Sequence, residues 1–415
     1  MRLAARTCLI LTLLIFAGCA FSKLGEDLAR MEDQVHLFTG FVSSEALELH
    51  STVIVAMDDS DANNVISFRM LSGEGVFEIR RTRQDSWFFA FADLNKDLRF
   101  QADEPYGWAA NGGAVAPTIP ETHGVDITIG APGQPAFPEK LVDEPLEFHL
   151  RNYARTHIGS VSSMDDPLFS TAQGKKGLWQ PFAFWEDGGT GLHFAQPFDK
   201  DKIPVVFIHG INASPQDFVT IIDALDTSRY QAWFVSYPSG LRLSWLARGV
   251  YQFLEVLHHQ YEFDDLHIVA HSMGGLVSRG ALNICSQNRS CDYVASFTTI
   301  STPWDGVASA ASGVKWAPTV VPVWNDLYPQ SEYVSTLFDT PLPDGLPHYL
   351  IFGFRQESFL SSGSSDGVIE LSSQLRDSAQ DGATSIRGFD EGHVSILHSD
   401  VVLENVLGLL EQASR

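Results

Sequence analysis

A strand that runs directly into a helix through a very tight turn is the feature that most constrains this fold. Residues 265–279 read Asp-Leu-His-Ile-Val-Ala-His-Ser-Met-Gly-Gly-Leu-Val-Ser-Arg, an apolar strand followed by helical spacing. Such a turn holds the residue at its tip, Ser272, in a strained backbone conformation. Because strand and helix crowd together there, the residues two before and two after the serine must be small. Ala270 and Gly274 meet that requirement.

Strands and helices alternate along the second half of the chain. The expected strands are Ile203–Ile208, Tyr230–Tyr237, Leu266–Ala270, Val294–Ile300 and Tyr349–Phe354. The expected helices are Phe218–Leu225, Leu243–Tyr261, the segment after Ser272, and Asp400–Leu410. This alternation predicts an α/β fold with a mostly parallel sheet covered on both faces. Leu178–Trp185 and Gly191–Ala195 are expected to add antiparallel strands at its start.

A second motif, His209-Gly210-Ile211-Asn212, stands at the end of the first parallel strand. Taken with Ala-His-Ser-Met-Gly-Gly at 270–275, it resembles the α/β-hydrolase superfamily, in particular bacterial lipases and esterases. The resemblance covers about residues 203–415. It implies that the backbone N–H groups of Met273 and Ile211 hold an oxyanion. By itself, His-Gly would favour an ordinary turn at the end of a strand.

The superfamily carries its acid and its histidine after the serine, in that order. Asp366 stands in an Asp-Gly-Val context after the strand that ends at Phe354, and His393 precedes the final helix. A serine hydroxyl needs a base to take its proton, and the imidazole needs a carboxylate to orient it. The resemblance therefore implies a triad of Ser272, Asp366 and His393. Asp305 is the alternative acid.

Other residues near these motifs have simpler interpretations. His271 flanks the serine and is expected to be a packing or hydrogen-bonding neighbour, and His398 to be structural. Residues 304–346 form an insertion rich in tryptophan and valine. Large apolar residues at this place suit a lid over a hydrophobic acyl group. Ordinary helices that complete the fold are the alternative.

The amino terminus has the pattern of a bacterial export signal. Arg2 and Arg6 precede an apolar run, Cys8–Ala17, that is too short to span a bilayer comfortably. The run ends in Phe-Ala-Gly-Cys at 16–19, which resembles a lipobox and implies lipid attachment at Cys19. By the same resemblance, Ala20 after the cysteine implies the outer membrane. The alternative is a signal peptide cleaved near position 17 or 20, with Cys19 incidental.

Composition excludes one class of partner. The chain has 27 Lys and Arg residues against 51 Asp and Glu residues, a formal net charge of −24, and its basic residues are scattered. Nucleic-acid binding needs clustered positive charge, so no nucleic-acid partner is expected. Cys285 and Cys291 flank a polar loop, and in an oxidising compartment they are expected to form a disulfide, with free thiols as the alternative.

Between the signal and the α/β region the sequence predicts a short helix and then an all-β domain. Leu24, Leu28, Met31, Val35 and Phe38 fall on one helical face. Short runs rich in Val, Ile, Phe and Trp then recur between Asp, Asn and Gly, which favours a small β-sandwich. The runs are Ser51–Met57, Asn64–Leu71, Val76–Arg83, Ser86–Ala92 and Val125–Ile129.

One loop of this β domain has the spacing of a calcium-binding loop. Oxygen-bearing side chains occupy loop positions 1, 3, 5, 9 and 12, namely Asp93, Asn95, Asp97, Gln101 and Glu104. Leu98 stands where such loops carry glycine, and no flanking helices are apparent. A structural Ca²⁺ site is one interpretation, and an acidic hairpin without metal is the other.

These observations predict a lipid-anchored protein of the bacterial cell envelope that hydrolyses esters or lipids without a cofactor. The expected regions are a signal peptide at 1–18, an anchor linker with a short helix at 19–44, a β-sandwich at 45–130, a linker at 131–148, and a catalytic domain at 149–415. Acyl transfer and amide cleavage use the same triad. A surface lipoprotein that binds without turnover is a further alternative. The sequence leaves the oligomeric state open.

Overall fold

The structure, a computed structural model, contains two compact units. It describes residues 2–44, 48–62, 65–71, 73–144, 146, 156–288, 291–355 and 364–413. The larger unit comprises residues 1–29, 159–251 and 263–415, and the smaller comprises residues 30–158 and 252–262.

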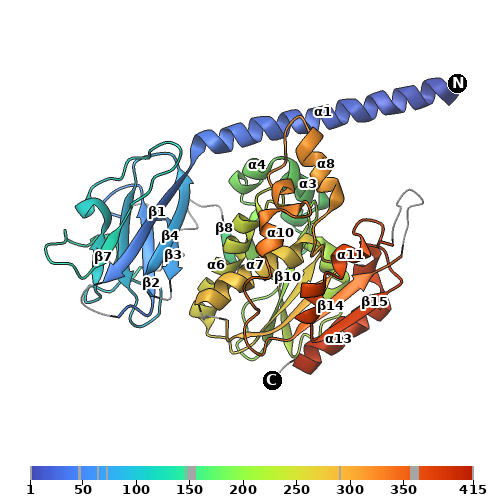
Figure 1. Ribbon diagram of the computed structural model, residues 1–415. Helices are drawn as coiled ribbons and strands as arrows, with labels where there is room; N and C mark the ends of the chain where they lie inside the picture. Colours follow the sequence, from blue (N-terminus) through green and yellow to red (C-terminus); the bar gives the residue numbers. More distant parts are fainter. Residues whose placement is uncertain are drawn as a thin grey trace. The chain divides into compact units, whose positions relative to one another are not determined.

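A single eight-stranded sheet forms the centre of the larger unit (Figure 1), with the strand order β15-β14-β13-β12-β10-β11-β9-β8. Its strands are β8 (Thr156–Val161), β9 (Thr190–Phe194), β10 (Ile203–Ile208), β11 (Tyr230–Ser236), β12 (Leu266–His271), β13 (Val294–Ile300), β14 (His348–Gly353) and β15 (Ser385–Phe389). Neighbours from β11 through β15 are parallel, whereas β9 pairs with β11 in the antiparallel direction. The predicted α/β fold with a mostly parallel sheet is confirmed.

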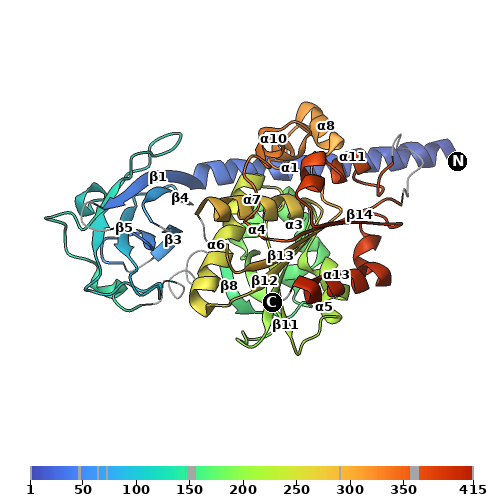
Figure 2. The same cartoon turned by 60° about the horizontal axis from the view of Figure 1, so that its bottom comes forward.

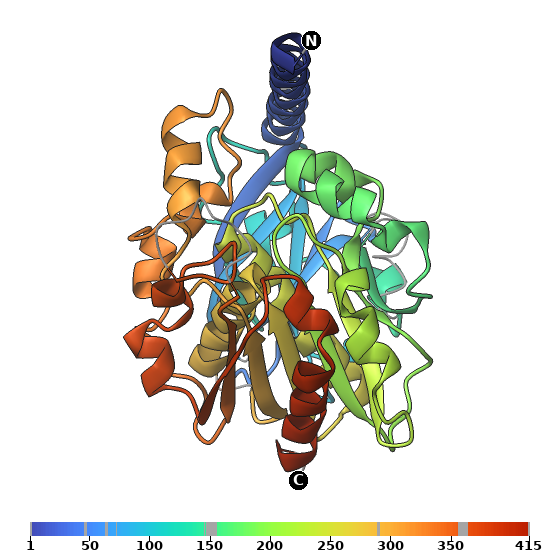
Figure 3. The same ribbon diagram turned by 90° about the vertical axis from the view of Figure 1, so that its right-hand side faces the viewer.

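Helices cover both faces of this sheet, as Figure 3 shows. Helices α5 (Val219–Asp223) and α13 (Asp400–Ala413) share one apolar core with β10 and β11. Helices α6 (Leu243–Tyr261) and α7 (Met273–Asn288) lie on the opposite face. Every residue of β11, β12 and β13 is buried. Burial on both faces explains why apolar residues predominate in these strands.

Shorter helices complete the larger unit at the carboxyl ends of its strands and before β9. Thr171–Trp179 forms α3 and Pro181–Glu186 forms α4. The insertion after β13 carries α8 (Ala308–Trp316), α9 (Trp324–Leu327) and α10 (Glu332–Thr336). Leu371–Gln374 forms α11 and Asp377–Asp381 forms α12. Leu178–Trp185 was expected to be a strand, and this prediction is wrong because α3 and α4 occupy it.

The smaller unit is built from two sheets, β4-β1-β7 and β3-β2-β5-β6 (Figure 2). The strands are β1 (Val35–Ser44), β2 (Thr52–Met57), β3 (Val65–Leu71), β4 (Gly75–Thr82), β5 (Trp87–Ala92), β6 (Tyr106–Trp108) and β7 (Ile127–Ile129). Side chains on one face of β2 and β5 share a core with β1, β4 and β7, while alternate residues of both strands enter a second core. This period of two is that of a sheet buried on both faces, and the all-β prediction is confirmed.

The amino-terminal segment differs from the prediction in two ways. Helix α1 runs without interruption over Arg2–Gln34, and β1 begins at Val35. Val35 and Phe38 therefore belong to a strand, although their spacing matches the helical face that begins at Leu24. Among the described residues, no helix is sufficiently long and apolar to span a bilayer.

Candidate active site

Ser272 stands at the turn between β12 and α7 with φ of 54°, the strained conformation predicted from the sequence. Its backbone N–H donates to the carbonyl oxygen of Ile300 at 2.8 Å, which holds the turn against β13. A Cβ atom at Gly274 would lie 2.2 Å from the carbonyl oxygen of Ile208. Only glycine fits there, so the small residue two positions after the serine is a steric requirement.

The structure brings together three side chains that are far apart in the sequence. His393 Nε2 lies 2.9 Å from the Oγ of Ser272, and His393 Nδ1 lies 2.7 Å from a carboxylate oxygen of Asp366. The backbone N–H of His393 also donates to the carbonyl oxygen of Asp366 at 2.8 Å. Ser272 is 4% exposed and Asp366 is 1% exposed. This is the hydrogen-bond chain that activates a serine hydroxyl.

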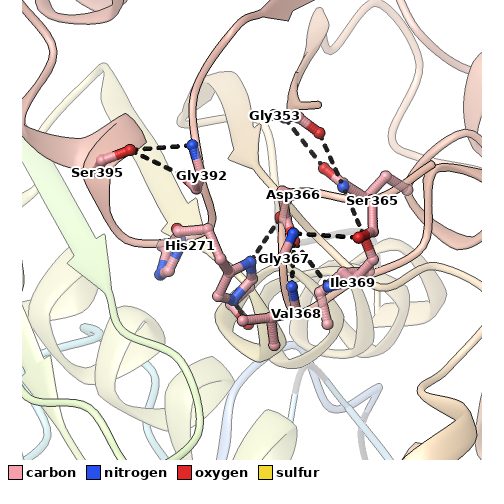
Figure 4. Close-up of polar contacts among 12 residues, drawn as sticks. His271, Gly353, Ser365, Asp366, Gly367, Val368, Ile369, Gly392 and Ser395 are labelled. Atoms are coloured by element: carbon pink, nitrogen blue, oxygen red, sulfur yellow. Dashed lines mark hydrogen bonds and ion pairs between the residues drawn. The ribbon is translucent and has the colours of Figure 1, made fainter. Parts of the chain in front are cut away.

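Asp366 is held as a carboxylate by its surroundings (Figure 4). Burial by itself would raise the pKa of this carboxyl, but the hydrogen bond and charge of His393, together with the N–H groups of Ile369 and Val368, lower the pKa below its usual value. The N–H groups of Ile369 and Val368 donate to its other oxygen at 2.7 and 3.0 Å. An ionised, fully bonded carboxylate fixes the Nδ1–H tautomer of His393 and leaves Nε2 able to accept the serine proton.

His271 holds the backbone of His393 by a hydrogen bond. Its Nε2 lies 2.8 Å from the carbonyl oxygen of His393, so Nε2–H is the donor, and the two rings are 4.8 Å apart. Burial lowers the pKa of His271 to about 3, and the neighbouring His393 contributes in the same direction. His271 is therefore a neutral hydrogen-bonding neighbour of the base. This matches the interpretation made from the sequence.

The His-Gly motif packs directly against the serine. A Cβ atom at Gly210 would lie 2.9 Å from the Cβ of Ser272 and 3.3 Å from its Oγ. In the described part of the chain, the N–H groups of Ile211 and Met273 have no hydrogen-bond acceptor. Met273 is the first residue of α7, and the first N–H groups of a helix lack partners within it. Both expected oxyanion donors therefore lie beside the serine with their hydrogens unused.

His209 and Tyr237 stabilise the His-Gly motif, although no role was predicted for Tyr237 from the sequence. Nδ1 of His209 lies 2.8 Å from the carbonyl oxygen of Gly210. The rings of His209 and Tyr237 stack with centroids 4.2 Å apart, and the Tyr237 hydroxyl donates to the carbonyl oxygen of His209. Burial lowers the pKa of His209 to about 4. The role of Tyr237 could have been predicted from its place at the end of a buried strand that neighbours the strand before His-Gly.

Residues 199–330 match a protein family described as "Putative serine esterase (DUF676)". The match includes the His-Gly motif and Ser272 and covers about a third of the chain, whereas Asp366 and His393 lie beyond it. The family match supports a serine hydrolase of esterase type.

Several solved structures have similar folds at low sequence identity. The mature form of lipase BlEst2 from Bacillus licheniformis is 19% identical with a TM-score of 0.44, and the alignment covers 53% of this chain and 97% of that one. Lipase B from Aspergillus fumigatus is 15% identical with a TM-score of 0.41, and the alignment covers 54% of this chain and 56% of that one. No curated protein sequence matches the chain.

The alternative residues lie outside the hydrogen-bonded triad. Asp305 faces Arg376 at 3.9 Å and its side chain is 57% exposed, whereas the buried Asp366 contacts the histidine. His398 lies at the end of a short 3-10 helix, where Nδ1 is 2.8 Å from the Thr220 hydroxyl. These contacts favour Asp366 over Asp305.

Hydrogen bonds and buried residues fix part of the insertion at 304–346 to the rest of the larger unit. The buried carboxylate of Asp326 accepts from the Arg242 guanidinium at 2.6 to 2.9 Å and from the N–H of Leu243 at 2.7 Å. Val321 and Val323 are fully buried, whereas Trp316 at the end of α8 is 75% exposed. The insertion therefore has one part that is fixed by Asp326 and another that exposes the large apolar side chain of Trp316.

The remaining predicted positions lie away from the triad. Cys285 and Cys291 form a disulfide with a Cα–Cα distance of 5.5 Å, which confirms that prediction. Cys19 is a free, exposed cysteine on α1. Lipid attachment there remains a prediction.

Several carboxylate oxygens of the calcium-like loop accept hydrogen bonds from the loop itself. Glu104 accepts from the N–H groups of Leu94 at 2.8 Å and Gln101 at 3.0 Å, and Asp93 accepts from those of Asp97 at 3.1 Å and Leu98 at 3.3 Å. Leu98 takes the positive φ, 57°, for which glycine is usual in such loops. Side chains of the predicted set also contact one another, because the amides of Asn95 and Gln101 each donate to Asp97 at 2.9 Å.

Burial and neighbouring charge act together on Glu104 in this loop. Burial raises the pKa of Glu104 to about 7, and the charges of Asp93 and Asp97 contribute in the same direction. In the described ranges, no group of three or more His, Cys, Asp or Glu side chains is arranged to hold a metal ion. Calcium binding remains a prediction.

Proposed function

We propose that this protein is a carboxylic ester hydrolase that works through an acyl-enzyme at Ser272. The observation that carries the proposal is the hydrogen-bond chain from Ser272 through His393 to Asp366, in which the two links measure 2.9 and 2.7 Å. These distances lie within the range required for proton transfer between a nucleophile and its base. The turn that presents Ser272 and the glycine packed against it supply the remaining parts of an acyl-transfer site.

Each residue has a defined role in the proposed reaction. Ser272 Oγ attacks the ester carbonyl carbon while His393 Nε2 takes the hydroxyl proton. The resulting oxyanion accepts hydrogen bonds from the N–H groups of Met273 and Ile211, which need no reorganisation during the reaction. Collapse breaks the bond to the leaving alcohol, which receives the proton from His393. Water then attacks the acyl-enzyme by the same steps, and His393 returns the proton to Ser272.

The side chains around Ser272 and His393 have pKa values shifted away from their usual range. The surroundings of Asp366 lower the pKa of its carboxyl, and burial lowers the pKa of the His271 and His209 rings, which favours their neutral forms. In the proposed reaction, His393 takes the proton of Ser272. Its developing positive charge faces the carboxylate of Asp366, which stabilises it.

The proposed substrate is an ester with a hydrophobic acyl group, and no cofactor takes part. A lipid substrate agrees with the proposed location, which is the bacterial cell envelope and most simply the outer membrane, with a lipid attached at Cys19. The exposure of Cys19 agrees with a modification at this residue. The apolar tip of the insertion at Trp316 agrees with contact to a lipid-like molecule.

The test measures hydrolysis of p-nitrophenyl esters of increasing acyl length, together with labelling by a fluorophosphonate probe. Ser272→Ala is expected to lower kcat by more than about 10⁴-fold and to abolish labelling. Ser278→Ala is the matched control, because Ser278 is buried like Ser272. Ser278 lies on α7, and its hydroxyl donates to the carbonyl oxygen of Gly274 one turn earlier. Turnover that survives Ser272→Ala would rule the proposal out, as would an unmodified protein that neither labels nor turns over.

A further inference from the structure

A groove beside Cys19 lies outside the active site and has no part in the proposed reaction. Its volume is about 350 Å³. Two segments that are distant in the sequence form it, the part of α1 that begins at Cys19 and the part of α3 that ends near Gln180 (Figure 1). Its lining includes Lys23 on α1 and Lys175, Lys176 and Trp179 on α3.

A buried carboxylate holds this part of α1 on the larger unit. Asp27 is 3% exposed and accepts from the backbone N–H of Phe182 at 2.7 Å and of Ala183 at 3.0 Å. Both N–H groups belong to the first turn of α4, where they have no partner within the helix and where a negative charge is favoured. The contact therefore joins α1 to a helix about 155 residues away in the sequence.

Aromatic packing fixes the same segment next to the groove. The ring centroid of Phe21 lies 5.2 Å from that of Trp179 and 6.4 Å from that of Trp324, with edge-to-face geometry in both pairs. Leu24, one turn before Asp27, is fully buried. The α1 wall of the groove is therefore held by a polar contact and an apolar contact on the same unit that carries α3.

The groove is positively charged although the protein as a whole is strongly acidic. Three of its eight lining residues are lysines and none is acidic, whereas the full chain has a formal charge of −24. Lys176 pairs with Asp187. In the part of the chain that the structure describes, Lys23 and Lys175 have no carboxylate within ion-pair distance. Two ammonium groups are thus available to an anion in the groove.

The chemistry of the lining indicates which anion fits. Lysine ammonium groups bind phosphate as point charges, and tryptophan prefers the boundary between apolar and polar surroundings. Trp179, Ala20 and Ala172 give the groove an apolar side next to its lysines. Positive charge beside an apolar aromatic surface matches a phospholipid, whose phosphate is joined to an apolar glyceride. A small inorganic anion would leave the apolar side without a partner.

We propose that the groove formed by α1 and α3 binds the phosphate-bearing headgroup of a membrane phospholipid. The proposal rests on the proposed lipid attachment in one respect. A lipid on Cys19 would hold the groove at the level of the phospholipid headgroups of the membrane. It is independent of the esterase reaction, because neither α1 nor α3 contributes a residue to the triad. Bound phospholipid would offset the repulsion between an acidic protein and an anionic membrane surface.

Native mass spectrometry tests the proposal on the full chain, released from a non-ionic detergent. All variants carry Ser272→Ala, so that no lipid is hydrolysed and turnover does not enter the result. The probes are dioleoylphosphatidylglycerol and, as the matched lipid without phosphate, dioleoylglycerol. Lys23→Gln with Lys175→Gln removes the two available charges. Lys200→Gln, an exposed lysine of the same unit outside the groove, is the control.

Saturable binding of phosphatidylglycerol is expected, roughly 30-fold weaker in the double variant and unchanged in Lys200→Gln. Lys175→Gln alone is expected to weaken binding roughly 5-fold. Binding of dioleoylglycerol should not respond to either lysine. Equal binding of phosphatidylglycerol by the parent and the double variant would overturn the proposal. Displacement of the lipid by inorganic phosphate at equal concentration would also overturn it, because the groove would then be a site for free anions.

Discussion

Gly210 lies so close to Ser272 that a Cβ atom on the glycine would meet the serine Cβ at 2.9 Å and its Oγ at 3.3 Å. These distances are shorter than ordinary carbon contacts, so a side chain at position 210 must displace the nucleophile or the adjoining N–H of Ile211. The glycine thus sets the distance between the serine and one proposed oxyanion donor.

Gly210→Ala is therefore expected to lower kcat by about 10²- to 10³-fold, the usual effect of misplacing an oxyanion donor or a nucleophile. The measurement is steady-state hydrolysis of a p-nitrophenyl ester, with a melting curve to show that the variant is folded. Gly249→Ala is the matched control, because a Cβ atom at this position of α6 meets no atom within 4 Å. Equal rates for both variants would separate Gly210 from the reaction.

Asp366 and Asp305 offer a direct comparison of two carboxylates. Asp366→Asn is expected to lower kcat by about 10⁴-fold, because an amide cannot hold the Nδ1–H tautomer of His393. Asp305→Asn should leave kcat within a few-fold, since its exposed carboxylate faces Arg376 and not the histidine. The values of kcat, measured at saturating ester concentration, decide which of the two aspartates acts as the acid. A large loss for Asp305→Asn with a small loss for Asp366→Asn would reverse the assignment.

The sequence was sufficient for parts of the site that depend on local chemistry. Strand β10 has the expected bounds, because a strand buried on both faces is close to an unbroken apolar run. Strand β13 also has the expected bounds, although Ser296, Thr298 and Thr299 interrupt its apolar residues. The serine turn could be predicted because its steric requirement falls on residues within five positions. The pairing of the acid and the histidine depended on chain order and on the resemblance, since nothing local brings residues 272, 366 and 393 together.

Elements that depend on distant contacts or on exposed edges were missed. Strand β15 is largely exposed and has no apolar run. The segment Leu178–Trp185 is rich in aromatic residues that favour strands, but Pro181 at the first position of α4 and the carboxylate of Asp27 from α1 stabilise a helix there. Because Asp27 is distant in the sequence, no local pattern could predict this contact.

Buried histidines are expected to make the protein sensitive to acid. Burial lowers the pKa of His267 to about 4 and of His348 to about 3, as it does for His209 and His271. A histidine whose pKa is lower in the folded state than in the unfolded state binds fewer protons when folded. Its stabilising contribution is therefore present above pH about 6.5 and is lost as pH falls toward the folded pKa.

His348→Gln tests this expectation. Between pH 7.5 and pH 5, the free energy of unfolding of this variant should fall by about 2 kcal/mol less than that of the parent protein. Urea denaturation at the two pH values gives the difference, in which any constant cost of losing the hydrogen bond to Thr299 cancels. His398→Gln, which changes an exposed ring, should follow the parent. Parallel curves for His348→Gln and the parent would contradict the prediction.

Glu104 is expected to act in the opposite direction. Its folded-state pKa of about 7 is raised above the ordinary value, chiefly by burial. The folded state therefore holds this proton more tightly, and stability falls as pH rises from about 4.5 to about 7. Glu104→Gln should remove this part of the pH dependence of unfolding of the smaller unit. Glu139→Gln, at an exposed position of the same unit, is the control.

The same pair of variants tests calcium. If the loop binds Ca²⁺, the ion would neutralise Glu104, Asp93 and Asp97, and the Tm at pH 8 should be higher in Ca²⁺ than in EDTA. The increase should disappear in Glu104→Gln and persist in Glu139→Gln. An identical Tm of the parent protein in Ca²⁺ and in EDTA would leave the loop as an acidic hairpin without metal.

Asp27 is expected to determine whether α1 stays on the larger unit. Asp27→Ala removes the acceptor of two N–H groups at the start of α4 and should cost about 1 to 2 kcal/mol of unfolding free energy. Hydrogen exchange provides the local readout, because the amides of Phe182 and Ala183 should lose protection together with residues 19–29. Glu26→Ala, one position earlier with an exposed side chain, should change neither region. Unchanged protection in Asp27→Ala would show that apolar contacts such as those of Phe21 and Leu24 hold the segment, and the groove beside Cys19 would then not depend on this carboxylate.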